Sequence, residues 1–173
     1  MNMQTTGMHL VDATNAPEIY VLIGVPGSGK STWVEKFLAS STKEFTVVSS
    51  DAVLDQIAAE KGLKYSDVHK DFIGLATSKA KQIFREALAS RANIIFDQTN
   101  VSKKKRRGIL QQTPKDYVKL AVVFQTEDKE VDRRLTERAE KTGKHIPGFV
   151  MKDMYSRWET PTRDEGFDRI IKA

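Results

Sequence analysis

Nine consecutive residues near the start of the chain have the types and spacing of a phosphate cradle. They satisfy the pattern Gly-x-x-x-x-Gly-Lys-Ser/Thr and are Gly24, Val25, Pro26, Gly27, Ser28, Gly29, Lys30, Ser31 and Thr32. Glycines let such a loop wrap so that backbone N–H groups point at phosphate oxygens. Lys30 can reach the β- and γ-phosphates of a nucleotide, and the Ser31 hydroxyl can ligate Mg²⁺. The segment therefore predicts a site for ATP and Mg²⁺, and the alternative is an ordinary glycine-rich turn between a strand and a helix.

Asp51 follows a predicted strand at residues 45–48 and could act as the base of a phosphoryl transfer. A carboxylate at this place could accept the proton of an attacking hydroxyl. The other interpretation is a helix N-cap, because Asp is favoured there and a helix is expected to begin near Ala52. One carboxylate could do both, and the phosphate cradle on the neighbouring strand favours the catalytic role.

Asp97 ends another predicted strand, at residues 93–96. This is the pattern of an acid that supports Mg²⁺ or its water shell beside bound phosphates, so Ser31 and Asp97 are the predicted metal residues. Thr99 and Asn100 add hydrogen-bonding groups at the same edge, and we expect them to bind the substrate together with Asp97. The alternative is a turn cluster, since Asp and Asn favour turns.

Arg134 and Arg138 are four residues apart on a predicted helix and therefore share one face. Arginines on a helix that closes over a triphosphate can stabilise the charge that develops at the γ-phosphate. The alternative is a solvated helix face, because nearby glutamates could form ion pairs with both arginines.

Five successive cations follow the segment that contains Asp97, and they are Lys103, Lys104, Lys105, Arg106 and Arg107. They begin a predicted helix that Ser102 can cap. At this end of a helix the dipole disfavours each positive charge by roughly a few tenths of a kcal/mol. A bound polyanion would offset this repulsion, so we expect Lys103 and Arg106 to contact an acceptor strand. The net charge of +5 also favours a polyanionic partner. The alternative is a solvated surface run.

The apolar pattern positions these residues on alternating strands and helices. Strands are predicted at residues 20–23, 45–48, 93–96, 117–124 and 167–171, and helices at residues 30–38, 71–88, 129–141 and 150–158. This alternation predicts an α/β fold with a mainly parallel sheet covered by helices on both faces. Ligands bind beyond the carboxyl ends of such strands, so the phosphate cradle, Asp51 and Asp97 are expected in one crevice.

The chain is expected to form one domain, with residues 1–17 as a flexible lead-in and residues 18–173 as the folded unit. It has no cysteine, no apolar run long enough to span a membrane and no pattern of a signal peptide. We therefore expect a cytoplasmic location and no membrane partner.

Several of these segments together resemble the 5′-kinase domain of polynucleotide kinases. The likeness runs from about residue 19 to residue 171, nearly the whole chain. It rests on the cradle and Trp33, on Asp51, on residues 97–100 and on Arg134 and Arg138, with further similarity at Ile146-Pro147, Met151, Tyr155 and residues 165–168. Residues 97–102, DQTNVS, also resemble the P-loop domain of heterogeneous nuclear ribonucleoprotein U.

The resemblance implies a P-loop fold with an arginine-bearing helical lid, and transfer of the γ-phosphate of ATP to a 5′-hydroxyl of DNA or RNA. In that role Lys30 and Ser31 hold phosphates and Mg²⁺, and Asp51 activates the 5′-hydroxyl. Asp97 and its neighbours orient the acceptor, while Arg138 and Arg134 lie over the β- and γ-phosphates.

Two departures from the family pattern bear on this expectation. Bacteriophage members carry an Arg three residues after the base, where this chain has Leu54, and no DxDG-type phosphatase motif occurs here. Leu54 favours a first alternative, a small-molecule or zeta-toxin-like sugar-nucleotide kinase. A second alternative is a non-catalytic, nucleotide-dependent RNA-binding module.

Overall fold

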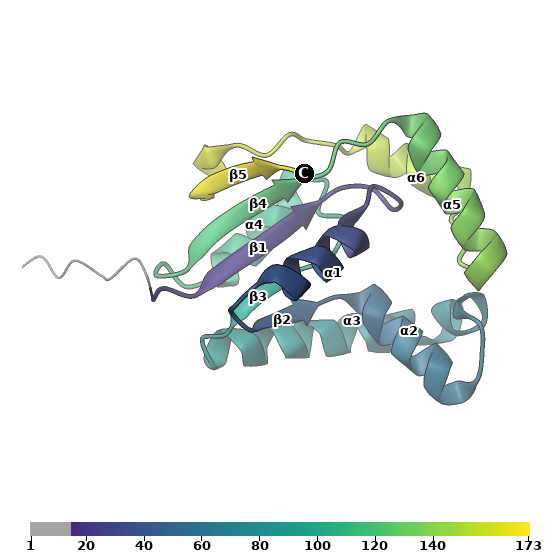
Figure 1. Ribbon diagram of the computed structural model, residues 1–173, viewed down its shortest axis with the longest axis horizontal. Coiled ribbons are helices and arrows are strands. Elements are labelled where there is room, and N and C mark those ends of the chain that lie inside the picture. The colour runs from purple at the N-terminus through teal and green to yellow at the C-terminus, as the bar shows by residue number, and fades with distance from the viewer. Residues whose placement is uncertain (1–14) are drawn as a thin grey trace, which may run out of the picture.

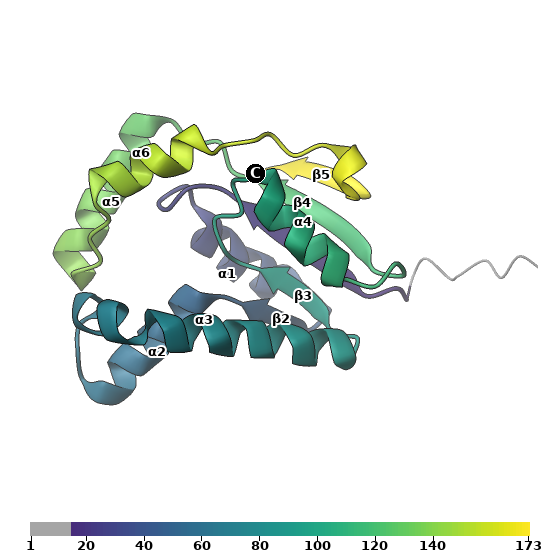
Figure 2. The ribbon, with the colours of Figure 1, turned by 180° about the vertical axis from the view of Figure 1, so that it is seen from behind.

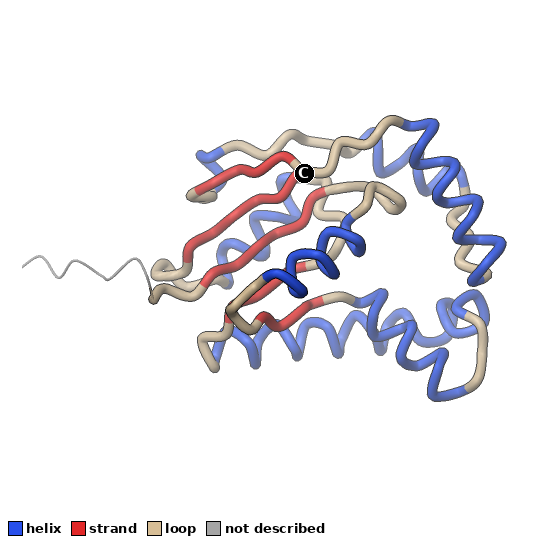
Figure 3. Tube along the Cα trace, in the orientation of Figure 1, coloured by secondary structure: helices blue, strands red, loops and turns tan. Residues whose placement is uncertain are grey.

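A five-stranded sheet runs through the molecule, and all of its strand pairs are parallel. The computed structural model describes residues 15–173. The strands lie in the order β2-β3-β1-β4-β5 (Figures 1 and 3). Their bounds are Glu18–Ile23 for β1, Phe45–Val48 for β2, Asn93–Phe96 for β3, Val118–Val123 for β4 and Arg169–Lys172 for β5.

The central strand β1 is buried on both faces, because its side chains alternate between two cores. Ile19, Val21 and Ile23 point to one core, and Leu22 points to the other. Helix α1 (Lys30–Ser40) covers the Leu22 face, and helices α3 (Tyr65–Ala89) and α4 (Lys103–Gln112) cover the opposite face (Figure 2). The predicted α/β fold, with a parallel sheet between two helical layers, is therefore confirmed.

Three further helices lie near the carboxyl ends of the strands: α2 (Ser50–Lys61), α5 (Asp128–Thr142) and α6 (Gly148–Ser156) (Figure 1). Helix α2 packs on the first half of α3 through a small core of its own that includes Val53, Leu54 and Val68. Helices α5 and α6 pack through Val131 and Met151 against the start of the phosphate cradle. A single 3-10 turn, η1 (Arg163–Glu165), precedes β5.

The strand order places a crevice at the edge where the ligand residues were expected. The chain leaves β1 toward β2 on one side and leaves β3 toward β4 on the other. The carboxyl ends of β1 and β3 therefore lie at a topological switch point, where open α/β sheets bind ligands. A backbone hydrogen bond of 2.9 Å from Gly24 N to Thr99 O joins the two chain segments there.

The predicted element bounds differ from the structure mainly at α3, which begins at Tyr65 instead of residue 71. Most of the predicted lead-in, residues 1–14, lies outside the described residues. Pro17 is buried, and its carbonyl accepts a 2.9 Å hydrogen bond from Val118 N, so the backbone joins the sheet before residue 18. Within residues 15–173 no helix is both long and apolar enough to cross a bilayer.

Candidate active site

The phosphate cradle forms a tight loop between β1 and α1. Gly27 and Gly29 have φ values of 80° and 101°, which place both in the left-handed region that favours glycine. Gly24 is required for a different reason, because a Cβ there would lie 2.4 Å from Ser28 Oγ. Gly29 is also the N-cap of α1, so the backbone N–H groups at the start of this helix face the inside of the loop. Such a loop suits a phosphate anion.

Lys30 folds back over the loop that precedes it. Its Nζ donates to Gly24 O at 2.8 Å and to Val25 O at 2.9 Å. Burial lowers the pKa of Lys30 to about 8, although the charges of Asp97 and Asp51 act in the opposite direction. A bound phosphate would favour the protonated form, because it would put a negative charge beside the ammonium group.

The cradle opens into a cleft of about 1150 Å³ at the carboxyl ends of the strands. The cleft brings together most of the predicted site residues: Pro26, Gly27, Ser28, Gly29, Lys30, Ser31, Thr32, Asp51, Asp97, Thr99, Arg134 and Arg138. Gly24 lies at the base of the loop. Lys103 is exposed at the start of α4 and does not line the cleft.

Asp51 lies in the first turn of α2, but it is not the cap of that helix. Ser49 is the N-cap, and its Oγ accepts a 3.2 Å hydrogen bond from Ala52 N. The N-cap interpretation of Asp51 is therefore wrong, since a serine two residues earlier satisfies the free N–H group. The Asp51 side chain is 58% exposed and lines the cleft.

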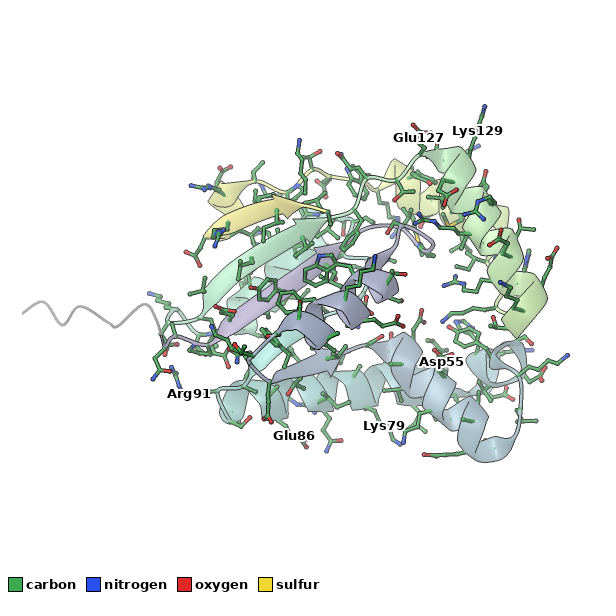
Figure 4. The ribbon with its side chains drawn as sticks, in the orientation of Figure 1. Asp55, Lys79, Glu86, Arg91, Glu127 and Lys129 are labelled. Atoms are coloured by element: carbon green, nitrogen blue, oxygen red, sulfur yellow. The ribbon has the colours of Figure 1, made fainter. Side chains whose placement is uncertain are left out.

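Two donors hold the carboxylate of Asp51. Tyr65 Oη donates to Oδ1 at 2.9 Å, and Lys144 Nζ lies 3.1 Å from Oδ2. Burial alone would raise the pKa of Asp51, but Lys144, the Tyr65 hydroxyl and the charge of Arg138 outweigh it and keep the pKa below its usual value. The candidate base is thus ionised at neutral pH. Asp55, one turn further along α2, extends from the same helix and also lines the cleft (Figure 4).

Asp97 follows β3, and its backbone N donates to Val48 O at 2.9 Å, which fixes it between the ends of β2 and β3. Burial raises its pKa, and Lys30 offsets only part of that rise. Residues 15–173 hold no group of three His, Cys, Asp or Glu side chains placed for a metal. Mg²⁺ is commonly held by one or two protein oxygens together with substrate phosphates. Ser31 and Asp97 both line the cleft and fit that pattern.

The arginines of α5 differ in what they contact. Arg134 Nε donates to Glu130 at 2.6 Å, and its Nη1 donates to Gly27 O at 3.3 Å, so this side chain braces the cradle. Arg138 Nε and Nη2 are buried with no hydrogen-bond partner among residues 15–173. Unpaired buried donors cost free energy. Their position in the cleft fits an anion as the missing partner, as the predicted lid role requires.

Two predicted substrate residues are structural instead, and the prediction is corrected for both. Asn100 is 1% exposed with φ of 47°, and its side-chain amide donates to Leu22 O at 2.8 Å. Arg106 is fully buried: it forms an ion pair with Glu165 at 2.8 Å and donates to the carbonyls of Asn100 and Val101 at 3.1 Å. Neither side chain can reach an acceptor, because both hold the backbone after β3 in place.

Sequence analysis missed several residues that line the cleft. Lys144 and Tyr65 hold Asp51, as described above, and Thr126 Oγ1 donates to Ser28 O at 2.9 Å and so supports the cradle. Lys105, not Lys103, is the member of the basic run that lines the cleft. Gly143, a typical helix terminator, marks the end of α5 directly before Lys144, but it does not indicate what Lys144 contacts. Tyr65 and Thr126 carried no signal in the sequence.

Two known proteins contain a segment that is similar in sequence to most of this chain. The human heterogeneous nuclear ribonucleoprotein U-like protein 2 is 28% identical over 160 residues, which cover 88% of this chain and 21% of that protein. L-seryl-tRNA(Sec) kinase of Methanococcus maripaludis is 24% identical over 156 residues, which cover 87% of this chain and 56% of that protein. The chain thus spans about a fifth of the first relative and about half of the second.

Solved structures share the fold. A chain of the Pnkp1/Rnl/Hen1 RNA repair complex has a TM-score of 0.62 at 24% identity, over 82% of this chain and 44% of that chain. A chain of the PezAT toxin–antitoxin system of Streptococcus pneumoniae has a TM-score of 0.66 at 17% identity, over 91% of this chain and 67% of that chain. Residues 19–161 match the AAA_33 family model, described as an AAA domain. The chain therefore belongs to the AAA_33 family and has its P-loop, kinase-like domain.

Proposed function

We propose that this protein transfers the γ-phosphate of ATP to the 5′-hydroxyl end of DNA or RNA. The hydroxyl oxygen forms a bond to the γ-phosphorus, and the bond from that phosphorus to the β,γ-bridging oxygen breaks. ADP leaves with the electron pair, and the hydroxyl proton passes to a carboxylate oxygen of Asp51. Ser31 and Asp97 would hold Mg²⁺, which would neutralise part of the charge on the phosphates.

The observation that carries the proposal is the position of Asp51 in the cleft of the phosphate cradle. Asp51 is ionised at neutral pH and lines the same cleft as Lys30, whose pKa responds to its charge. A protein that used the cradle only for structure or regulation would not need a carboxylate at this place. Arg138 adds two donor nitrogens, which have no partner among residues 15–173, to the same cleft, where charge develops during transfer.

A nucleic-acid acceptor is favoured by charge and by the relatives. Lys105 adds a cation to the cleft that Asp97 also lines, and the chain as a whole carries +5. The names of the relatives include a ribonucleoprotein and a kinase of a tRNA-linked serine, and a structural neighbour comes from an RNA repair complex. These names describe those proteins, and for this chain they support RNA or DNA as the acceptor.

A second candidate is a kinase with a small-molecule or sugar-nucleotide acceptor. Leu54, at the place of the acceptor-binding Arg of phage polynucleotide kinases, is fully buried between α2 and α3. No side chain at residue 54 could reach an acceptor without leaving this core. This favours an acceptor that is recognised differently from the phage substrates, and the toxin-system neighbour has the matching fold.

The test is incubation with γ-labelled ATP, Mg²⁺ and 5′-hydroxyl oligonucleotides of DNA and RNA. Asp51→Asn and Lys30→Ala serve as the inactive variants, and Lys129→Ala, an exposed residue of α5, serves as the control. Label on the oligonucleotide that both site variants abolish is the expected result. ATP hydrolysis without labelled oligonucleotide would exclude a polynucleotide acceptor, and the same assay with sugars and nucleotide sugars would then test the second candidate.

A further inference from the structure

A second groove, with a volume of about 410 Å³, is lined by residues of α3, α4 and the end of β3. Helices α3 and α4 lie on the face of the sheet opposite α1 (Figure 2). Gln98 and Lys105 line both this groove and the active-site cleft. The two hollows therefore meet beside the carboxyl end of β3. A long molecule with one end in the cleft has a continuous path along the groove.

The groove is lined by cations and by no carboxylate. Lys81 and Arg85 lie one turn apart on α3, so they share the face toward the groove, and Lys105 lines it from α4. None of the three forms an ion pair within the described part of the chain. Like charges gathered along one hollow attract a polyanion that can bridge them.

The two aromatic residues that line the groove do not expose a ring face on which a base could stack. Phe84 and Phe96 are buried and pack edge to face with centroids 5.0 Å apart. Bases stack on exposed rings, and these rings are covered. Gly108, in the middle of α4, also lines the groove, and a Cβ there would meet nothing within 4 Å. Glycine in a helix interior permits close approach of a ligand to the backbone.

We propose that this groove binds the sugar–phosphate backbone of a single-stranded acceptor beyond its 5′ nucleotide. Lys81, Arg85 and Lys105 contact successive phosphates of the strand, and the contact is independent of base sequence because the lining offers no base-reading aromatic face. The inference rests on the proposed function, since it takes the acceptor end to lie in the cleft. It adds to that function the path of the strand and the residues that select a polymer over a single nucleotide.

The experiment measures binding of a fluorescent 5′-hydroxyl single strand of about 12 nucleotides by anisotropy across a range of salt concentrations. The variant is Lys81→Ala/Arg85→Ala, and the matched control is Lys79→Ala/Lys129→Ala. Lys79 and Lys129 are exposed and do not line the groove, and they point away from the cleft (Figure 4). Both variants lose two positive charges at exposed helix positions, so a difference between them reports the groove alone.

The groove variant is expected to bind the strand at least tenfold more weakly than the control at low salt. Each lost phosphate contact lowers the slope of log affinity against log salt by about 0.7, so the slope should become shallower by about 1.4. Equal affinities and slopes for the two variants would overturn the proposal, as would a failure of the unsubstituted protein to bind the strand. The γ-phosphate labelling assay decides the proposed function separately, because anisotropy needs no turnover.

Discussion

Lys144 Nζ lies 3.1 Å from Asp51 Oδ2, and this contact joins the chain after α5 to the first turn of α2 across the cleft. The same ammonium group lies 4.0 Å from the centroid of the Tyr65 ring, and Tyr65 donates to the other oxygen of Asp51. Lys144 is only 11% exposed, whereas Asp51 is 58% exposed, so solvent reaches the pair mainly from the carboxylate side. The ionisation of the candidate base thus depends on a residue from the far side of the cleft.

Replacement of Lys144 by Met should raise the pKa of Asp51. Burial raises this pKa, and among the groups that lower it Lys144 has the largest effect. Without the ammonium group, the effect of burial is opposed only by the remaining groups. The base then takes up its proton at a higher pH, and the acidic limb of kcat/KM for phosphate transfer moves upward. Carbon-13 NMR of the Asp51 carboxyl measures the same shift without turnover. Lys129→Met is the control, and an unchanged titration of Asp51 in Lys144→Met would contradict the assignment.

Nucleotide affinity should fall as the pH rises above about 8. The nucleotide-free protein loses the Lys30 proton near this pH, whereas bound phosphates favour the ammonium form, so binding at higher pH must take up a proton. The dissociation constant should rise by at most about tenfold per pH unit. Calorimetric titration with ADP between pH 7 and 10 measures it. The Lys30→Ala variant should bind ADP weakly, with an affinity that does not change with pH. Lys43 pairs with Glu18 and does not line the cleft, so the Lys43→Ala variant should show the same pH dependence as the unsubstituted protein.

Gly24→Ala should damage the cradle, because the new Cβ would lie 2.4 Å from Ser28 Oγ and 2.9 Å from Phe124 Cβ. Forced overpacking of this kind costs about 1–3 kcal/mol of unfolding free energy, and the displaced loop should also bind ATP more weakly. Gly74→Ala is the matched control: Gly74 lies inside α3 with nothing within 4 Å of a new Cβ. That variant should gain about 0.5–1 kcal/mol. Urea unfolding of both proteins makes the comparison, and similar midpoints would refute the close approach at Gly24.

The cradle, the two carboxylates and the two arginines of α5, which the structure gathers in one cleft, could be picked out in the sequence because each has a local signature. The cradle is a fixed spacing, Asp97 directly follows an apolar strand, Asp51 follows another after two serines, and the two arginines lie one turn apart. Parallel strands then bring these segments to one edge, which the alternation of elements also predicts. The position of Lys144 depends on how α5 closes on α2, and no local pattern encodes that packing.

The wrong predictions for Arg106 and Asn100 also arise from contacts between residues that are far apart in the sequence. A basic run shows how many cations a helix start carries, but not which of them turn inward. Arg106 faces the core because Glu165, 59 residues later, returns to pair with it in η1. Asn100 follows Asp97 in a segment typical of a ligand-binding edge, yet its amide holds the end of β1. Local chemistry suggested a role for each residue, and a distant partner determined it.

Arg106→Ala should therefore destabilise the protein without a specific effect on the acceptor. It would leave the Glu165 carboxylate buried and unpaired, with a side chain that is 2% exposed. Removal of one partner of a buried ion pair costs about 3–5 kcal/mol of unfolding free energy. Lys103→Ala, at an exposed position three residues earlier, should change it by less than about 0.5 kcal/mol. Urea unfolding checks both values, and equal stability of the two variants would show that Arg106 is not a brace.

Arg138→Ala should slow phosphate transfer while the fold is kept. Arg138 Nε and Nη2 have no partner among the described residues, so their loss removes no internal hydrogen bond. If these donors stabilise charge at the γ-phosphate, kcat should fall by about 10²–10³-fold with the melting temperature unchanged. Arg134→Ala should instead weaken ATP binding, since Arg134 contacts the cradle at Gly27 O. Arg157→Ala, an exposed residue after α6 that pairs with Asp153, is the control. A kcat for Arg138→Ala equal to that of this control would remove Arg138 from the reaction and leave it as a solvated residue of the cleft wall.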